Sequence, residues 1–381
     1  MRIERIDVFR FKFSLAKPFT IALGSVSTKE VVIVRIEDNR GDIGWGEASP
    51  SQRILGSSVA TTLAAMDALV PALLGEDPRR IGYLVERMDR VLEGNSAAKA
   101  ALDIALHDLV GRILGEPLWR LLGGHTPGPV STDFTVGIDA PEAMASEARA
   151  LVERGFREIK IKVGEDPVTD LERVRRIREA VGDGIVLRID ANQGWTPQEA
   201  LWALRRMAEY GVELVEQPVA AWDIQGLAWV RRHSPIPVMA DEAAHSPRDA
   251  LRLIQADAVD YINIKLMKSG GLWRAREIAT ICRNAGVLNM IGGMVETNLA
   301  ATAATHLALS EGNIRFRDLD LGTDPEAQLI AEGGSYIRDG DRHLSDPEAP
   351  GLGIHALEEG RLVPVRRYTL AEGGGSAKES I

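Results

Sequence analysis

Hydrophobic and polar positions change their spacing once in the first third of the chain. Residues 2–13 and 30–37 alternate between polar and apolar or β-branched side chains, a pattern typical of strands with one buried face. We expect two antiparallel strands here, separated by a loop over residues 17–25, where Gly and Pro interrupt the pattern. Residues 58–122 instead carry Ala and Leu at helical spacing. The first third therefore predicts a small sheet followed by a bundle of helices.

From residue 129 onward, short β-branched runs alternate with amphipathic stretches of helical length. The runs that we expect to form strands begin near Val130, Glu158, Ile185, Val212, Val238, Tyr261, Val287 and Ile314. Eight strands that alternate with helices predict a (β/α)8 barrel rather than an open sheet. Such barrels carry their chemistry at the carboxyl ends of the strands, so the residues that end each strand are the candidates for function.

These patterns divide the chain into four parts. Residues 1–125 form the predicted capping domain, and residues 126–345 form the barrel. Residues 346–370 contain further apolar runs and are expected to return to the capping domain. Residues 371–381 are rich in Gly, Ser and charged side chains, and we predict that they are disordered.

Composition and charge narrow the class of protein. The 381 residues are 45% hydrophobic and 26% charged, which is typical of a soluble enzyme or binding protein with a large core. A net charge of -10 without a basic run argues against nucleic acid or an anionic membrane as a partner. Cys282 is the only cysteine, and the sequence shows neither a signal peptide nor an apolar run that would span a membrane. We therefore expect a cytoplasmic protein without an internal disulfide.

The second strand of the predicted barrel carries two lysines. Lys160 and Lys162 are two residues apart, so their side chains leave the strand on the same face. Their mutual repulsion and partial desolvation are expected to lower a lysine pKa from about 10.4 toward neutrality, which suits a general base. Taken alone, the stretch also fits an ordinary strand whose lysines emerge at a sheet edge. The residues that follow favour the functional interpretation.

Each of the next three strands ends in a carboxylate: Asp190, Glu216 and Asp241. A single acidic residue at a strand end is more often a helix cap or a salt-bridge partner. Three on adjacent strands converge, and they would repel one another strongly without a cation. Hard oxygen ligands on rigid strands suit Mg2+ or Mn2+. The sequence therefore predicts a metal site at the barrel mouth.

The sixth strand places Lys265 across the mouth from Lys160 and Lys162. A divalent cation bound to a substrate carboxylate would stabilise the enediolate that forms when the neighbouring carbon loses its proton, with Lys160 assisting. One base is sufficient for an elimination, whereas two opposed bases permit inversion. Lys162 and Lys265 together therefore favour a 1,1-proton transfer.

The whole arrangement resembles the enolase superfamily, in its muconate-lactonizing-enzyme subgroup. The resemblance covers nearly the whole chain and rests on Lys-x-Lys, the three carboxylates and the later lysine. It implies an α/β fold, a modified (β/α)8 TIM-type barrel with an α+β capping domain. Within this subgroup, residues 263–271 and the Asp318-Leu319-Asp320 motif are similar to those of dipeptide epimerases of the L-Ala-D/L-Glu type.

This resemblance implies the roles of the site residues. Lys162 and Lys265 would be the acid/base pair, and the three carboxylates would hold one Mg2+ per subunit, with Mn2+ as an alternative. Asp318 and Asp320 would hold the free α-ammonium of a dipeptide, and Thr135 matches a threonine that contacts the substrate. A helix cap is the competing interpretation of the Asp-x-Asp motif. The superfamily also implies a homo-oligomer.

The predicted substrate preference rests on Gly24. Dipeptide epimerases that act on Ala-Glu place an arginine in the first-domain loop, and the matching position here is Gly24. Glycine cannot pair with a glutamate side chain. The apolar neighbours are Phe19, Ile21, Leu23, Ile54 and Leu55. We therefore predict that the C-terminal residue of the dipeptide has a hydrophobic side chain.

Alternative functions share the same metal and lysines. They are an N-succinylamino acid racemase or o-succinylbenzoate synthase, a muconate cycloisomerase and a hydroxyproline-type dehydratase. None of them needs the ammonium clamp at Asp318 and Asp320. A barrel that serves only as a binding or assembly module is the alternative from another class, and it would need neither the carboxylates nor the lysines.

Other polar residues receive supporting roles. Glu296 lies near the same mouth, where we expect a cap or a supporting contact rather than chemistry. Lys268 is expected to point outside the mouth or to form a salt bridge. Four histidines lack metal-ligand spacing and are expected to be structural: His107, His233, His245 and His306.

Overall fold

The computed structural model describes residues 1–124, 128–371 and 376–379. The capping domain is built on a five-stranded sheet in the order β18-β17-β1-β2-β3. Its strands are β1 (Ile3–Ile21), β2 (Gly24–Asp38), β3 (Ile43–Ala48), β17 (Val363–Leu370) and β18 (Ser376–Glu379). The pairs are antiparallel, as the alternating pattern predicts.

The first hairpin is longer than the sequence indicates. We expected a loop over residues 17–25, but β1 continues to Ile21 and β2 begins at Gly24. The register between the two strands shifts between Ser14 and Phe19, and this irregularity accommodates the Lys-Pro segment that interrupts the pattern. The result is a long β1–β2 hairpin that extends from the capping sheet.

The helices of the capping domain follow the first three strands. They are α1 (Val59–Leu69), the 3-10 turn η1 (Val70–Ala72), α2 (Ile81–Val91), α3 (Ser96–Leu114) and α4 (Leu118–Leu121). Ser58 and Thr61 form a capping box that begins α1. None of the helices in the described ranges is long and apolar enough to cross a bilayer.

The helix α3 lies directly against β3 because β3 presents glycine to it. A Cβ atom on Gly46 would overlap the carbonyl oxygen of Ala101 and would lie 2.8 Å from the nitrogen of Ala105. Both alanines are fully buried, so the helix offers a flat surface to the strand. This close approach leaves no room for a side chain at position 46.

We expect Gly46→Ala to lower the free energy of unfolding by about 1–3 kcal/mol, because overpacking a close backbone contact forces the helix away from the strand. Urea unfolding measures the effect. Gly360→Ala is the matched control, because a Cβ at Gly360 meets nothing within 4 Å. Equal unfolding midpoints for the two variants would contradict the close contact.

The second sheet has eight parallel strands in the order β12-β11-β10-β9-β8-β7-β6-β5. They are β5 (Phe134–Val136), β6 (Glu158–Lys162), β7 (Val186–Asp190), β8 (Val212–Glu216), β9 (Val238–Ala240), β10 (Tyr261–Lys265), β11 (Leu288–Gly292) and β12 (Ile314–Arg317). The sheet curls so that the backbone N–H of Asp133, just before β5, donates to the carbonyl of Arg317 in β12 at 3.1 Å. The predicted α/β fold of the barrel type, with an α+β capping domain, is confirmed.

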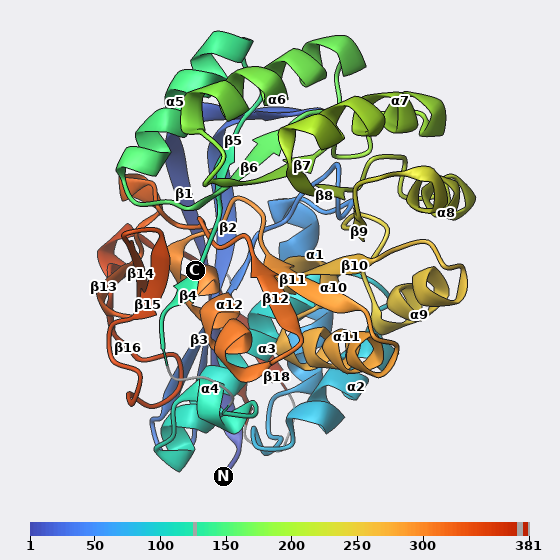
Figure 1. Ribbon diagram of the computed structural model, residues 1–381. Helices are drawn as coiled ribbons and strands as arrows, with labels where there is room; N and C mark the ends of the chain where they lie inside the picture. Colours follow the sequence, from blue (N-terminus) through green and yellow to red (C-terminus); the bar gives the residue numbers. More distant parts are fainter. Residues whose placement is uncertain (125–127, 372–375, 380–381) are drawn as a thin grey trace.

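The barrel helices alternate with these strands and lie on the outer side of the curled sheet (Figure 1). They are α5 (Pro141–Glu153), α6 (Pro167–Val181), α7 (Pro197–Met207), the 3-10 turn η2 (Ala208–Tyr210), α8 (Ile224–His233), α9 (Pro247–Gln255), α10 (Leu266–Ser269), α11 (Leu272–Asn284) and α12 (Asn298–Ser310). Three of them begin with proline directly after a capping side chain, from Asp166, Thr196 and Ser246. Proline fits the first helical position because its missing N–H would have no partner there.

The first barrel strand begins later than predicted. Val130–Ser131 form β4, which pairs with β15 (Asp341–Leu344) in a separate sheet with β14 (Ser335–Arg338). The barrel strand β5 starts at Phe134. Local pattern cannot separate the two, because both are short apolar segments and the pairing partner of β4 lies about 200 residues away in the sequence.

The chain then returns to the capping domain. The connecting elements are η3 (Pro325–Ala327), β13 (Ile330–Gly333), β16 (Ile354–Leu357) and η4 (Glu359–Arg361), after which β17 pairs with β1. Disorder over residues 371–381 was predicted, but Ser376–Glu379 form β18 on the open edge of β17, whose unpaired backbone groups accept another strand. Residues 372–375 and 380–381, and the predicted domain boundary at residue 125, lie outside the described residues.

Carboxylates of the capping domain bind the starts of two barrel helices. Glu47 of β3 accepts hydrogen bonds from the backbone N–H of Thr297 at 3.0 Å and of Ala300 at 3.2 Å, where α12 begins. Asp103 of α3 accepts one from the N–H of Leu272 at 2.5 Å, where α11 begins. A negative charge at a helix N-terminus is favourable. These contacts fix the capping domain on the barrel.

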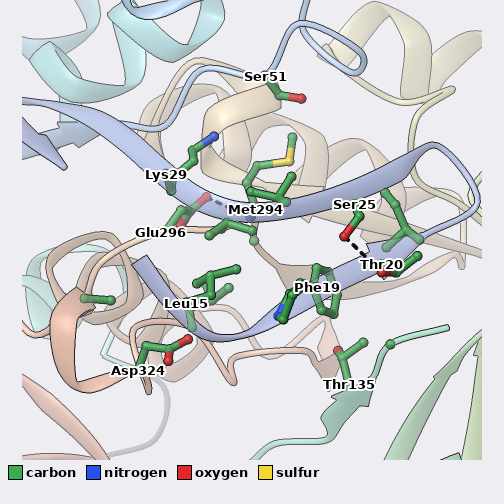
Figure 2. Close-up of a pocket in the computed structure, with 18 of the residues that line it drawn as sticks. Leu15, Phe19, Thr20, Ser25, Lys29, Ser51, Thr135, Met294, Glu296 and Asp324 are labelled. Atoms are coloured by element: carbon green, nitrogen blue, oxygen red, sulfur yellow. Dashed lines mark hydrogen bonds between the residues drawn. The ribbon is translucent and has the colours of Figure 1, made fainter. Parts of the chain in front are cut away.

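The β1–β2 hairpin is tied separately to the loop that follows β12. The backbone N–H of Ser14 donates to Glu326 at 2.7 Å, and that of Ala16 donates to Asp324 at 2.8 Å. The hairpin therefore runs over the end of the barrel at which the strands finish (Figures 1 and 2).

Candidate active site

The parallel register brings the predicted lysines and carboxylates together. Lys162 pairs with Asp190 across β6 and β7, and Asp190 pairs with Glu216 across β7 and β8. Asp241 directly follows β9, and Lys265 ends β10. The three carboxylates are fully buried and the two lysines are at most 5% exposed. Five residues separated by up to 103 positions thus share one end of the sheet.

The three carboxylates fit a divalent cation. Asp190, Glu216 and Asp241 each offer an oxygen, and these oxygens lie within 4.8 Å of one another. Oxygens coordinated to Mg2+ at about 2.1 Å on opposite sides lie about 4.2 Å apart, so this spacing is close to what the ion needs. Three carboxylates would leave the other positions of an octahedral shell open to water or substrate. All donors are carboxylate oxygens, the type that Mg2+ and Mn2+ prefer.

Neighbouring amides hold the carboxylates in place. The side-chain amide of Asn263 in β10 donates to Glu216 at 2.8 Å. The backbone N–H of Asn192 donates to Asp190 at 2.9 Å, and its side chain donates to Glu242 at 3.0 Å. In Glu216 and in Asp190, one carboxylate oxygen accepts this hydrogen bond, and the other oxygen does not.

Three lysines form ion pairs with the three carboxylates and offset their negative charge. The Nζ of Lys160 lies 2.7 Å from Glu216 and 3.2 Å from Asp190. Lys162 lies 2.5 Å from Asp190, and Lys265 lies 2.8 Å from Asp241. Lys160 and Lys162 share a face, as the strand period predicts, and approach the same aspartate.

The predicted lowering of a lysine pKa is wrong for two of these lysines. Burial by itself lowers the pKa of Lys160, but Asp318 and Glu216 outweigh burial and raise this pKa well above its ordinary value. Burial also opposes ionisation of Lys265, yet Asp241 raises the pKa of Lys265 above its ordinary value. The prediction counted repulsion between lysines and desolvation, and it left out the surrounding carboxylates.

The Asp-x-Asp motif faces the site and does not cap a helix. Asp318 accepts hydrogen bonds from Lys160 at 2.8 Å and from the hydroxyl of Thr135 at 3.3 Å, and Asp320 accepts one from the backbone N–H of Thr135 at 2.8 Å. The next helical turn, η3, begins after Asp324 and has no side-chain cap. The helix-cap interpretation is therefore wrong, and both aspartates line the cavity.

The two aspartates have different tendencies to ionise. Burial opposes ionisation of Asp318, but Lys160 and the other lysines lower the pKa of Asp318 below its ordinary range. Burial and the neighbouring Asp318 raise the pKa of Asp320 to about 6. A cationic group bound between them would favour the charged form of both.

A cavity of about 1030 Å³ lies between the barrel mouth and the β1–β2 hairpin. Lys162, Lys265 and Thr135 line it from the barrel, and Leu15 and Phe19 line it from the hairpin. Figure 2 shows these hairpin side chains projecting from β1, with Thr135 on the other side of the cavity. The two lysines therefore face one shared space that is large enough for a small molecule.

Comparison with known proteins shows the family of this chain. Residues 143–360 match the family model described as "Enolase C-terminal domain-like". Residues 5–123 match that of the "Mandelate racemase / muconate lactonizing enzyme, N-terminal domain". The chain belongs to the enolase superfamily. The first match falls on the barrel, and the second falls on the capping domain.

Several relatives within the enolase superfamily are named for epimerisation or racemisation. An L-Ala-D/L-Glu epimerase from Bacillus subtilis is 43% identical, with 93% of this chain and 97% of that protein covered. A hydrophobic dipeptide epimerase from Enterococcus faecalis is also 43% identical, with 93% and 99% covered. An N-succinyl-L-Arg/Lys racemase from Bacillus cereus is 35% identical, with 94% and 96% covered. The chain is accordingly an enzyme of the isomerase class.

Solved structures of epimerases from the enolase superfamily superpose closely on this chain. The substrate-liganded L-Ala-D/L-Glu epimerase from Bacillus subtilis superposes with a TM-score of 0.91 at 41% identity, with 94% of this chain and 99% of that chain covered. The dipeptide epimerase from Enterococcus faecalis, complexed with Mg and L-Leu-L-Tyr, has a TM-score of 0.88 at 43% identity, with 93% and 99% covered.

Some polar residues of this enolase-superfamily site were missed by the sequence analysis. Asn263 lies two residues before Lys265, so the period of the strand places both on one face and would have identified it. Glu242 had no such signal, because it follows Asp241 in an irregular turn; burial and Asp241 raise its pKa to about 8. Lys268 forms the salt bridge that was one of its two predicted roles, at 2.5 Å from Asp241.

Glu296 and two of the histidines form hydrogen bonds to the backbone. Glu296 lines the cavity and accepts a hydrogen bond from the N–H of Met294 at 2.9 Å. His306 receives the backbone N–H of Trp119 at 3.0 Å, and the ring of His107 lies 2.8 Å from the carbonyl of Asp103. These two histidines hold structural contacts away from the mouth.

Proposed function

We propose that this chain is a Mg2+-dependent dipeptide epimerase that inverts the α-carbon of the C-terminal residue by two-base 1,1-proton transfer. The observation that carries the proposal is that Lys162 and Lys265 line one cavity from strands four places apart in the eight-stranded order. A third side of that cavity carries the paired aspartates. Both the name and the bound dipeptide of the solved relatives support this choice of substrate.

Each lysine would serve one face of the α-carbon. The Nζ of one lysine would take the α-proton, which leaves the substrate as an enediolate, and the Nζ of the opposite lysine would return a proton to the other face. A cation held by the three carboxylates would offset the negative charge that otherwise raises the pKa of Lys265. Lys160 is placed by β6 beside Lys162 and would assist by contact with the substrate carboxylate. Because both lysines face one space, the substrate need not turn over between the two transfers.

The metal would sit at Asp190, Glu216 and Asp241, one ion per subunit, with Mn2+ as an alternative to Mg2+. When bound, it supplies Lewis acidity that stabilises the negative charge developing on the substrate carboxylate. Asn263 and Asn192 orient the carboxylates for this role through the hydrogen bonds described above.

The paired aspartates would select a dipeptide by its free α-ammonium. Asp318 and Asp320 lie beside Thr135 on the wall of the cavity, and Asp318 is already paired with Lys160 at 2.8 Å. A single ammonium would therefore balance the remaining negative charge of the pair. N-Succinylamino acids lack this ammonium, and they are the substrates of the main alternative activity, for which the 35% identical racemase is a relative. The hydrophobic preference predicted from Gly24 stays a prediction; the apolar hairpin residues support it, and a basic residue considered below opposes it.

Chromatographic separation of diastereomers tests the proposal. The enzyme, incubated with L,L-dipeptides and Mg2+, is expected to convert them to L,D-dipeptides, and N-acetylated versions of the same dipeptides are expected to react poorly. Conversion of N-succinylamino acids in preference to free dipeptides would favour the alternative.

The substitution Asp320→Asn is expected to raise the KM for a dipeptide by about 10- to 100-fold, because a hydrogen bond to a charged group contributes roughly 1.5 to 3 kcal/mol. Steady-state kinetics measure the change. The matched control is Asp139→Asn, since Asp139 also lines the cavity but pairs with Lys17 at 3.8 Å. An unchanged KM in Asp320→Asn would contradict the ammonium clamp.

A further inference from the structure

The cavity extends beyond the two lysines to the underside of the β1–β2 hairpin. Phe19, Ile21 and Leu23 of the hairpin and Ile54 of the loop after β3 form apolar walls there. If the proposed function holds, the α-carbon lies between the lysines and the ammonium lies at the paired aspartates. The region under the hairpin is then the space that remains for the side chain on the α-carbon.

Arg53 belongs to the loop after β3, and its side chain lies beside Gly24 at the tip of the β1–β2 hairpin. A Cβ atom on Gly24 would overlap Nη1 of Arg53 and would lie 2.9 Å from its Cζ. The guanidinium therefore occupies the space that a side chain at position 24 would fill. Gly24 has a φ of +125°, a backbone conformation that favours glycine, so the arrangement of the turn itself keeps this position open. Both residues line the cavity.

Arg53 has no acidic partner among the residues that the structure describes. Two of the carboxylates that line the same cavity pair with other basic residues: Glu30 lies 2.5 Å from Arg10, and Glu147 of α5 lies 2.6 Å from Lys17. Arginine stays charged at any working pH. Arg53 is exposed, and it lines the cavity without a carboxylate partner in the described part of the chain.

A second basic residue, Lys29, also lines the cavity. Lys29 of β2 donates to the carbonyl of Pro50 at 2.6 Å, and Figure 2 shows it on the same side of the cavity as Glu296. Burial and the neighbouring Glu47 raise the pKa of Glu296 to about 8, so this carboxyl is mostly protonated at neutral pH. Burial lowers the pKa of Lys29 from its ordinary value.

We propose that Arg53 determines substrate preference, and that the subsite under the hairpin takes an acidic side chain on a short aliphatic stem, as in a C-terminal glutamate. The apolar walls would contact the methylene groups, and the guanidinium would pair with the carboxylate, whose planar shape it matches. A fully apolar side chain would cover the guanidinium without giving it a partner, which is unfavourable.

The test compares L-Ala-L-Glu with L-Ala-L-Gln, because these dipeptides have nearly the same shape and differ in charge. The kcat/KM of the unmodified enzyme is expected to be about 10- to 100-fold higher for L-Ala-L-Glu. In Arg53→Gln that ratio is expected to fall to about one, while kcat/KM for L-Ala-L-Gln and L-Ala-L-Leu changes by less than about threefold.

Arg154→Gln is the control, since Arg154 also lines the cavity but lies over the ring of Phe134, 5.3 Å from its centroid. It is expected to leave the Glu-to-Gln ratio unchanged. Turnover of dipeptides without a Glu preference, or a preference that survives Arg53→Gln, would overturn this inference and leave the proposed function in place. Absence of epimerisation for every dipeptide would overturn both.

Discussion

Replacing either Lys162 or Lys265 by alanine is expected to reduce epimerisation by at least about 10²- to 10⁴-fold, the usual contribution of a positioned acid or base. Each lysine is held against a different carboxylate, Lys162 at 2.5 Å from Asp190 and Lys265 at 2.8 Å from Asp241. Neither can therefore take over the position of the other. Loss of one base removes either the step that takes the proton or the step that returns it.

The two alanine variants are expected to differ in hydrogen exchange. With one lysine left, the α-proton of only one diastereomer faces a base, so one variant exchanges the L,L-dipeptide and the other exchanges the L,D-dipeptide. NMR of each diastereomer in deuterated water measures this. Lys17→Ala is the control, because Lys17 lines the same cavity and is paired with Glu147. Exchange of both diastereomers by either variant would contradict the assignment of one lysine to each face.

Removing one metal ligand is expected to have an effect of similar size. The substitution Glu216→Gln keeps the size of the side chain and a hydrogen-bonding partner for Asn263, but removes the charge. Lewis-acid stabilisation supplies several kcal/mol, so kcat/KM is expected to fall by about 10³-fold. Isothermal titration calorimetry is expected to show weaker binding of Mg2+, which is a readout independent of turnover.

The control for this prediction lies on the same strand. Glu213 also belongs to β8, but it lies near the start of the strand, three residues before Glu216, and pairs with Arg188 at 2.7 Å. Glu213→Gln is therefore expected to bind Mg2+ like the unmodified protein. A chelator is expected to stop the reaction of the unmodified enzyme, and added Mg2+ is expected to restore it. Full Mg2+ affinity in Glu216→Gln would contradict the carboxylate site.

The barrel and its strand-end residues were predictable because both depend on local periodicity. The period of two placed Lys160 and Lys162 on one face, and parallel strands then brought Asp190 and Glu216 into adjacent register, as the structure shows. The position of the first barrel strand was not predictable in the same way. Val130 pairs with Arg342, and a contact so distant in sequence leaves no local signal.

Electrostatics and loop contacts were the least predictable features. The direction of the Lys160 pKa depends on Asp318, which lies 158 residues further along the chain. The substrate preference was argued from the absence of a side chain at Gly24. The structure shows that Arg53, which belongs to another loop, lies in the space left by that glycine. A missing charge at one position therefore did not establish that the site lacks charge.

The central claim is two-base epimerisation of a dipeptide, and one measurement tests it most directly. Pooled L,L-dipeptides are incubated with the enzyme and Mg2+ in deuterated water and followed by mass spectrometry. We predict that particular dipeptides gain one mass unit, and that removal of both Lys162 and Lys265 abolishes the gain. No gain in any dipeptide, with the metal bound, would contradict the claim and would favour N-succinylamino acids or cycloisomerisation as the chemistry of this site.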